Sequence, residues 1–243
     1  LSILEVSHRG KEFVAVVEET QAIIKELLGV PDGYEILFLG GGASTQFLMV
    51  AYNLLETKGT YLKTGVWAAN AVKEAKYLGN VEVVASSEDR NYSYIPKGYT
   101  IPSDADYFHC TSNNTIAGTQ MKSFPKHNGT TVCDMSSDIF SRQLDFTQFD
   151  VIYAGAQKNM GPAGVALVII RDDLVGLNHR KLHTMLNYET HVEKKSMFNT
   201  PPVFSVFVVK NKCPFSCFTF PYLSRSDIVV ILTTSIFLRS KTT

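Results

Sequence analysis

The hydrophobic positions along the chain change their spacing from one segment to the next. Over residues 11–28, apolar side chains recur every three or four positions, which predicts an amphipathic helix. Beyond it, short apolar runs bounded by glycine or polar residues alternate with further helical patterns. This predicts helices at 46–55 and 68–77, and strands at 34–39, 60–64, 81–85, 107–111, 130–134, 151–154 and 165–170.

The alternation of strands and helices predicts an α/β fold, with a mixed, mostly parallel sheet flanked by helices on both faces. A chain of 243 residues, 45% of them hydrophobic, can bury the core of one large domain. The pattern changes near residue 210, where a segment rich in Phe, Ser, Thr and Cys begins. We therefore expect one domain over 1–209 and a divergent tail over 210–243.

Charge and cysteine content exclude several classes of protein. Lys and Arg together number 23, as do Asp and Glu, so no basic surface for nucleic acid is indicated. The apolar run 228–238 is shorter than the roughly 20 residues of a membrane span, and no membrane partner is expected. Cys213 and Cys217 lack a second ligand pair, so no metal site is expected. Cys110 and Cys133 lie in apolar runs typical of buried thiols, which favours a reducing, cytoplasmic location.

A glycine-rich turn at 40–45 separates an expected strand from an expected helix, an order that suits a phosphate site. The turn lacks the spacing of a Walker loop or a dinucleotide fingerprint, and a tight structural turn explains it equally well. Trp67, the only tryptophan, follows a strand end and either stacks on a planar cofactor or fills the core. Arg9, after His8, could bind a carboxylate or be a solvated charge.

Lys158 follows an apolar strand and is flanked by small residues. Desolvation there would lower the pKa of its amine and favour the neutral form that bonds a carbonyl, although an ordinary surface lysine is the alternative. Asp134 ends the strand 130–134, where a carboxylate can face a ligand. It could instead cap a helix or a turn, as could Ser136 and Ser137. A lysine, an acid, an anion site and a flat side chain are the groups that a pyridoxal 5'-phosphate (PLP) enzyme requires.

Together these residues lie in stretches that resemble one family, the phosphoserine aminotransferases, which are fold-type I PLP enzymes of serine biosynthesis. The Gly-Ala-Gln-Lys-Asn stretch at 155–159 and the Asn-Thr-Pro-Pro stretch at 199–202 are the most specific. The matching stretches follow the family's order and lie at 4–11, 38–44, 65–68, 113–118, 133–138, 154–159 and 197–202. The resemblance implies the PLP-binding large domain over 1–209, with 210–243 in place of a largely missing small C-terminal domain.

The resemblance also implies a role for each matching residue. Lys158 bonds the cofactor and moves the substrate proton, Asp134 pairs with the ring nitrogen, and Trp67 stacks on the ring. Ala43, Ser44 and Gln157 contact the phosphate of PLP, and Thr115 lies near its phenolic oxygen. Arg9 binds a carboxylate of the substrate, and His8 helps to bind the substrate's phosphate. A homodimer is implied, in which Asn199 and Thr200 reach the partner's cofactor.

The implied reaction is amino transfer between O-phospho-L-serine and 2-oxoglutarate, giving 3-phosphooxypyruvate and glutamate, and the family also serves pyridoxine biosynthesis. Two alternatives remain. One is a truncated homologue that binds PLP with weak or absent turnover, because Arg225 and Arg239 lie in a context unrelated to the family's substrate-binding arginines. The other is a different fold-type I chemistry such as desulfuration, which is disfavoured because no cysteine lies in a suitable polar loop.

Overall fold

The central sheet has seven strands in the order β1-β9-β8-β7-β4-β2-β3, in a computed structural model that describes residues 2–216. The strands are β1 Tyr34–Leu39, β2 Lys58–Lys63, β3 Asn80–Ser86, β4 Tyr107–Thr111, β7 Thr131–Asp134, β8 Val151–Gly155 and β9 Ala166–Arg171. A separate hairpin pairs β5 Asn113–Asn114 with β6 Thr119–Gln120. The α-helices are α1 Lys11–Leu28, α2 Gly42–Leu54, α3 Val66–Lys76, α4 Tyr188–Glu193 and α5 Val203–Ser216.

Strand direction determines where ligands can bind in this sheet. β9 pairs antiparallel with both β1 and β8, while the pairs among β8, β7, β4, β2 and β3 are parallel. Six strands therefore point the same way, and their carboxyl ends meet at one edge of the sheet. The expected mixed, mostly parallel sheet is confirmed, and this edge is where α/β proteins bind ligands.

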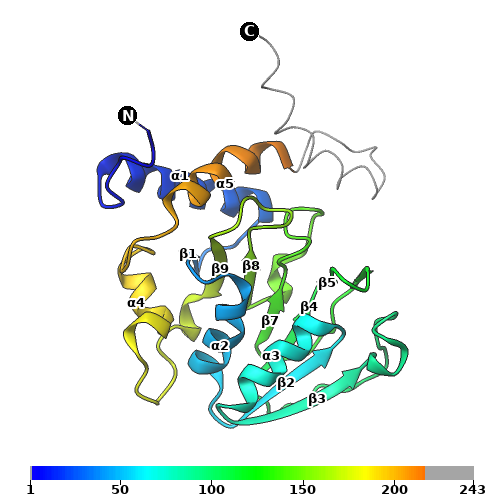
Figure 1. The fold of residues 1–243 in the computed structure, drawn as a ribbon. Coiled ribbons are helices and arrows are strands. Elements are labelled where there is room, and N and C mark those ends of the chain that lie inside the picture. Colours follow the sequence, from blue (N-terminus) through cyan, green and yellow to red (C-terminus); the bar gives the residue numbers. More distant parts are fainter. Residues whose placement is uncertain (1, 217–243) are drawn as a thin grey trace.

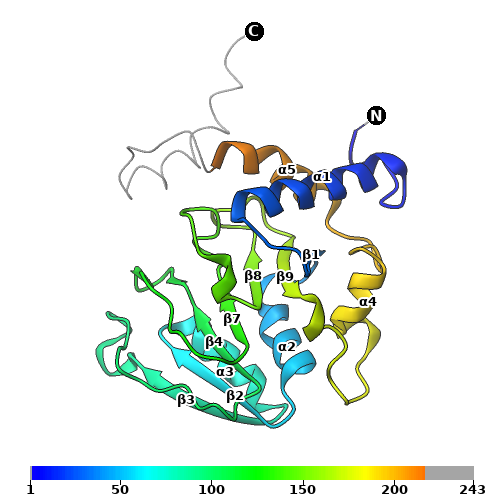
Figure 2. The same cartoon turned by 180° about the vertical axis from the view of Figure 1, so that it is seen from behind.

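Helices cover both faces of the sheet. α2 and α3 pack on one face, and α1 and α5 lie side by side over the other (Figures 1 and 2). Alternate residues of each strand enter opposite cores: on β9, Leu167 and Ile169 pack toward α1 and α5, whereas Val168 and Ile170 pack toward α2 and α3. This two-sided burial explains why the strands read as continuous apolar runs.

The first helix has the bounds expected from its periodicity. Phe13, Val17 and Ile24 are almost fully buried on its inner face, and Gly29 ends it in the left-handed conformation at φ 62°. α2, in contrast, begins four residues before the expected start at 46, because Gly41 adopts φ 86° and serves as its N-cap. Residues 42–45 of the expected turn therefore belong to the first helical turn.

The last described helix, α5, is continuous through residue 210, where we expected the tail to begin. The rest of that segment, including Cys217, Arg225 and Arg239, lies outside the described residues. Cys110 and Cys133 are buried, as expected. Within residues 2–216, no helix combines the length and apolarity that crossing a membrane requires.

Candidate active site

The carboxyl ends of β7 and β8 and the turn of the β5–β6 hairpin bring Lys158 together with hydroxyl groups. Lys158 follows β8, and its Nζ donates hydrogen bonds to Oγ1 of Thr115 at 2.6 Å and to Oγ of Ser137 at 3.1 Å. The same Nζ lies 5.8 Å from the centroid of the Trp67 ring. Side chains from three separate parts of the sequence thus surround one amine.

The surroundings of Lys158 favour its neutral form. The side chain is half-buried, and desolvation lowers the pKa of its amine below the usual range. The carboxylates of Asp134 and Asp138 oppose this effect by attracting the charged form. Because desolvation is the larger cause, more of the amine is unprotonated near neutral pH than in a solvent-exposed lysine, and an unprotonated amine can attack a carbonyl.

Asp134, at the end of β7, is only 3% exposed, and its burial raises the pKa of its carboxyl group. Its Oδ1 accepts hydrogen bonds from the backbone N of Ser136 at 2.9 Å and from Oγ of Ser136 at 2.6 Å. The turn contact considered from the sequence is therefore present. Oδ2 has no hydrogen-bond partner among residues 2–216, so a cationic N–H donor would satisfy it.

Trp67 is the second residue of α3. Gly65, just before the helix, lies in tight contact with Asn114. A β-carbon at Gly65 would lie 2.4 Å from Oδ1 of Asn114, so only glycine fits there. Nε1 of Trp67 is buried and has no partner in the described part of the chain. A cavity of about 130 Å³ adjoins this ring and is lined by Gly65, Val66, Trp67, Asn91, Tyr92, Asn114, Thr115, Ile116 and Ala117.

The start of α2 lies beside the end of β8. A β-carbon at Gly155 would lie 2.9 Å from Oε1 of Gln157 and 3.4 Å from the backbone N of Ala43, so both groups approach the same point. Among residues 2–216, no side chain caps the first turn of α2, which contains Ala43 and Ser44. Uncapped N–H groups at a helix N-terminus suit an anion such as a phosphate.

Four predicted residues are not part of this group. His8 and Arg9 lie in the turn before α1, and Asn199 and Thr200 are exposed between α4 and α5. Within the described ranges, no hydrogen bond or ion pair joins them to Lys158 or to its partners. The backbone N of Arg9 donates instead to Oγ of Ser7, at 3.3 Å.

Sequence reasoning treated Ser136 and Ser137 only as potential helix caps. In the structure, Oγ of Ser136 donates a hydrogen bond to Asp134, and Oγ of Ser137 accepts one from Lys158. Their position directly after an acid at a strand end is the signal that could have identified them, because the strand edge is where ligands bind. Of the residues described, no three His, Cys, Asp or Glu side chains form a potential metal site.

The site has the groups that PLP requires. In the described part of the chain, a half-buried lysine amine faces an aromatic ring, a buried carboxylate has one unpartnered oxygen, and an uncapped helix start lies near the end of β8. With a mostly parallel sheet whose single reversed strand is β9, these features define the large domain of a fold-type I PLP transferase.

Comparisons with known proteins identify the family. The family model for class-V aminotransferases matches residues 2–214, and the chain belongs to this family. It is 63% identical over 207 residues to the phosphoserine aminotransferase of Parabacteroides distasonis, covering 85% of this chain and 58% of that protein. It is 61% identical over 210 residues to the Flavobacterium psychrophilum enzyme, covering 85% and 59%. The chain thus spans about three-fifths of the length of these curated relatives.

Solved structures agree with this assignment. The phosphoserine aminotransferase of Bacillus circulans subsp. alkalophilus superposes with a TM-score of 0.85 at 48% identity, over 88% of this chain and 61% of that chain. A PLP-bound phosphoserine aminotransferase from Trichomonas vaginalis gives a TM-score of 0.84 at 33% identity, over 88% and 66%.

Proposed function

We propose that this chain forms the PLP-binding large domain of a phosphoserine aminotransferase. The observation that carries the proposal is the position of Lys158: its Nζ lies 5.8 Å from the Trp67 ring centroid, and the buried Asp134 carboxylate contributes to its electrostatic surroundings. A lysine, an aromatic face and a buried acid in this arrangement match three of the four groups that a PLP enzyme requires. The names of the relatives support phosphoserine as the amino donor.

PLP bound here would supply an aldehyde that forms imines with amines and a ring that withdraws electrons from the substrate Cα. Lys158 would hold the cofactor covalently and, once released, take the proton from the substrate Cα. Asp134 would keep a proton on the ring nitrogen, because a carboxylate opposite that atom favours its charged form. Trp67 would lie flat on the ring and exclude water from one side.

The remaining predicted residues would bind and orient. The uncapped first turn of α2, with Ala43 and Ser44, supports a phosphate site, to which the nearby Gln157 would add its amide. Thr115 would contact the phenolic oxygen, since its hydroxyl already lies 2.6 Å from Nζ of Lys158. His8 and Arg9 would bind the acidic groups of the substrate.

We further propose a cytoplasmic homodimer in which Asn199 and Thr200 reach the partner's cofactor. Both residues are exposed in this chain, which leaves them accessible to a second subunit. The reaction would transfer the amino group of O-phospho-L-serine to 2-oxoglutarate, giving 3-phosphooxypyruvate and glutamate. Phosphohydroxythreonine is a second substrate to be tested.

The cofactor proposal is tested by absorbance. Purified protein mixed with PLP should develop an imine band near the edge of the visible range, and Lys158→Ala should abolish it. Lys97→Ala, at an exposed lysine remote in sequence from the site, is the matched control and should keep the band. A wild-type protein without a band in excess PLP would overturn the proposal.

The substrate proposal needs a separate measurement. Glutamate formed from phosphoserine and 2-oxoglutarate should depend on added PLP and should be lost in Lys158→Ala. An imine band without glutamate formation would instead indicate a chain that binds the cofactor but does not catalyse the transfer.

A further inference from the structure

The turn that follows β7 serves two different parts of the site with adjacent residues. Ser136 donates to Asp134 through both its backbone N and its Oγ, and its Oγ also accepts from the backbone N of Gly155 at 3.0 Å. Ser137 contacts the lysine instead, with its Oγ 3.1 Å from Nζ of Lys158. The turn therefore connects the acid and the lysine of the proposed cofactor site.

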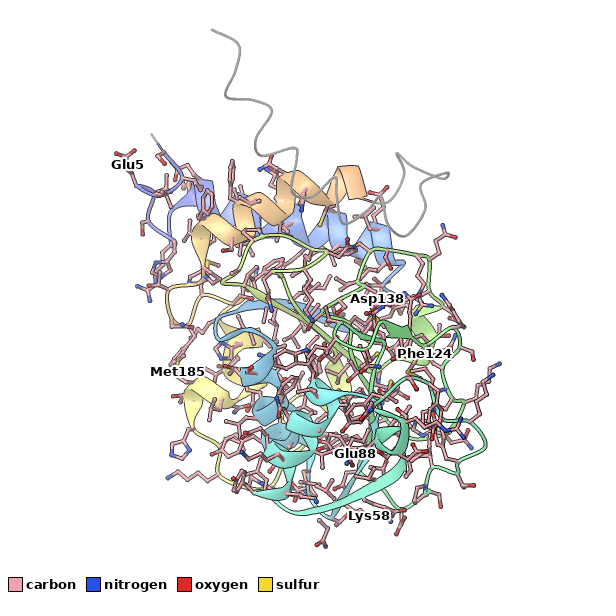
Figure 3. All side chains as sticks on the ribbon, turned by 45° about the vertical axis from the view of Figure 1, so that its right-hand side comes forward. Glu5, Lys58, Glu88, Phe124, Asp138 and Met185 are labelled. Carbon is pink, nitrogen blue, oxygen red and sulfur yellow. The ribbon has the colours of Figure 1, made fainter. Side chains whose placement is uncertain are left out.

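The hydroxyl of Ser137 is held in place by its neighbours. It shares a hydrogen bond with Oγ1 of Thr115, which is the second hydroxyl that accepts from Lys158. The next residue, Asp138, is 7% exposed and is labelled in Figure 3. Its carboxylate accepts from Oγ of Ser112 and, at 2.9 Å, from Nε2 of Gln120.

These contacts of Asp138 anchor both ends of the β5–β6 hairpin, whose turn carries Thr115. Ser112 precedes β5, and Gln120 is the last residue of β6. Arg142 also lies 3.5 Å from Asp138, which gives this buried carboxylate a cationic partner. Because the hairpin and the turn after β7 are tied at Asp138, Thr115 and Ser137 keep a fixed spacing around Nζ of Lys158.

We propose that Ser137 is a positioning residue that, with Thr115, holds the ε-amino group of Lys158 whenever this amine is not bonded to the cofactor. The inference rests on the proposed function, in which Lys158 is alternately bonded to PLP and free. A lysine amine that is not bonded to the cofactor has rotatable N–H donors on a long flexible stem and would otherwise sample many positions. Two fixed hydroxyls keep it within reach of the Trp67 face, where both the cofactor and the substrate Cα would lie.

The contact has a chemical consequence besides placement. A protonated amine donates to Ser137 and Thr115 through charge-assisted hydrogen bonds, which are stronger than those of the neutral amine. Losing the Ser137 hydroxyl should therefore disfavour the protonated form. Among the described residues, the ionisable groups whose charges act on this amine are Asp134 and Asp138, and the Ser137 variants keep both.

The test measures the pKa of Lys158 in the cofactor-free protein by competitive acetylation at a series of pH values, with mass spectrometry of the Lys158 peptide. Ser137→Ala should lower this pKa by about 0.5 to 1 unit, since one charge-assisted hydrogen bond is lost and water replaces it in part. Ser137→Thr keeps a hydroxyl and should restore the wild-type value. Lys73 and Lys76, exposed on α3, are internal references that should not change.

Ser137→Gly covers the case in which the alanine variant does not fold, because it also removes the hydroxyl and introduces no ionisable group. It should lower the pKa in the same direction. An unchanged Lys158 pKa in a folded Ser137→Ala or Ser137→Gly protein would overturn the inference. This readout needs no PLP, so it is independent of the imine band: a missing band in the wild-type protein overturns the cofactor proposal alone.

Discussion

The amide oxygen of Asn114 occupies the space that a side chain at residue 65 would need. A β-carbon on Gly65 would lie 2.4 Å from Oδ1 of Asn114, a buried residue whose Nδ2 donates to Oγ1 of Thr119 at 3.0 Å. Gly65 directly precedes α3, which carries Trp67. This close approach therefore fixes the start of α3 and with it the position of the Trp67 ring relative to Lys158.

Gly65→Ala should therefore destabilise the protein by about 2 kcal/mol, since overpacking a buried contact forces neighbouring groups to move. Trp67 is the only tryptophan, so its fluorescence should shift in the folded variant. Urea unfolding gives the free energy. Gly40→Ala is the control, because nothing lies within 4 Å of a β-carbon there. Equal stability of the two variants would contradict the prediction.

Asp134→Asn should separate stability from activity. The folded state raises the pKa of this carboxyl above its unfolded value, so the ionised form is disfavoured in the fold. Without PLP at pH 7, the amide should therefore stabilise the protein by about 1 kcal/mol. The gain should shrink as the pH falls through the folded-state pKa, because Asp134 is then protonated and neutral.

With PLP, the same variant should lose at least about 100-fold in amino transfer, because an amide does not keep the ring nitrogen protonated. Thermal unfolding without PLP and glutamate formation with PLP are the two measurements. A variant that is less stable than the wild type at pH 7 in the absence of PLP would contradict the electrostatic argument.

His109 is buried in the sheet between two tyrosines and should make stability depend on pH. Its Nε2 lies 2.8 Å from the hydroxyl of Tyr153, its ring stacks on Tyr61 at 4.9 Å, and burial lowers its pKa to about 3. Between that value and the unfolded pKa near 6.5, the unfolded state binds the extra proton, so stability falls as the pH falls.

Lowering the pH from 6.5 to 4.5 should cost about 2 kcal/mol of unfolding free energy through His109 alone. His109→Gln, which keeps a side-chain N–H for Tyr153, should lack this part of the pH dependence. Urea unfolding at the two pH values measures it. His179→Gln, at an exposed position, should keep the wild-type difference. A His109→Gln protein with that same difference would refute the assignment.

Asp106 holds the connection between α2 and β2 through both carboxylate oxygens, and its Oδ1 accepts from Oγ1 of Thr57 at 2.8 Å. Its Oδ2 accepts from the backbone N of Glu56, Thr57 and Lys58 at 2.8, 2.6 and 2.9 Å. Asp106→Ala should cost about 2 kcal/mol, because three backbone donors lose a charged acceptor. Asp104→Ala, which removes only an exposed and solvent-screened partner of Lys58, should cost much less. Comparable losses in chemical unfolding would contradict this ranking.

Much of the fold follows from local pattern. The periodicity of residues 11–28 gives α1 with its observed bounds, because an amphipathic helix needs apolar side chains every three or four positions. Lys158 and Asp134 were recognisable as candidates because each lies at the end of an apolar strand, and parallel strands bring their carboxyl ends to one edge. The start of α2 was predicted too late, because a left-handed glycine N-cap leaves no hydrophobic signal.

The sequence by itself determined which segments become strands and helices and which residues are candidates for the chemistry, since spacing along the chain records which side chains are buried. Only the tertiary structure decided that β9 runs antiparallel between β1 and β8, because an apolar run fits a buried strand in either direction. It also decided that Ser137 reaches Lys158, 21 positions further along the chain. Such contacts depend on how β7 and β8 pair, which no local pattern encodes.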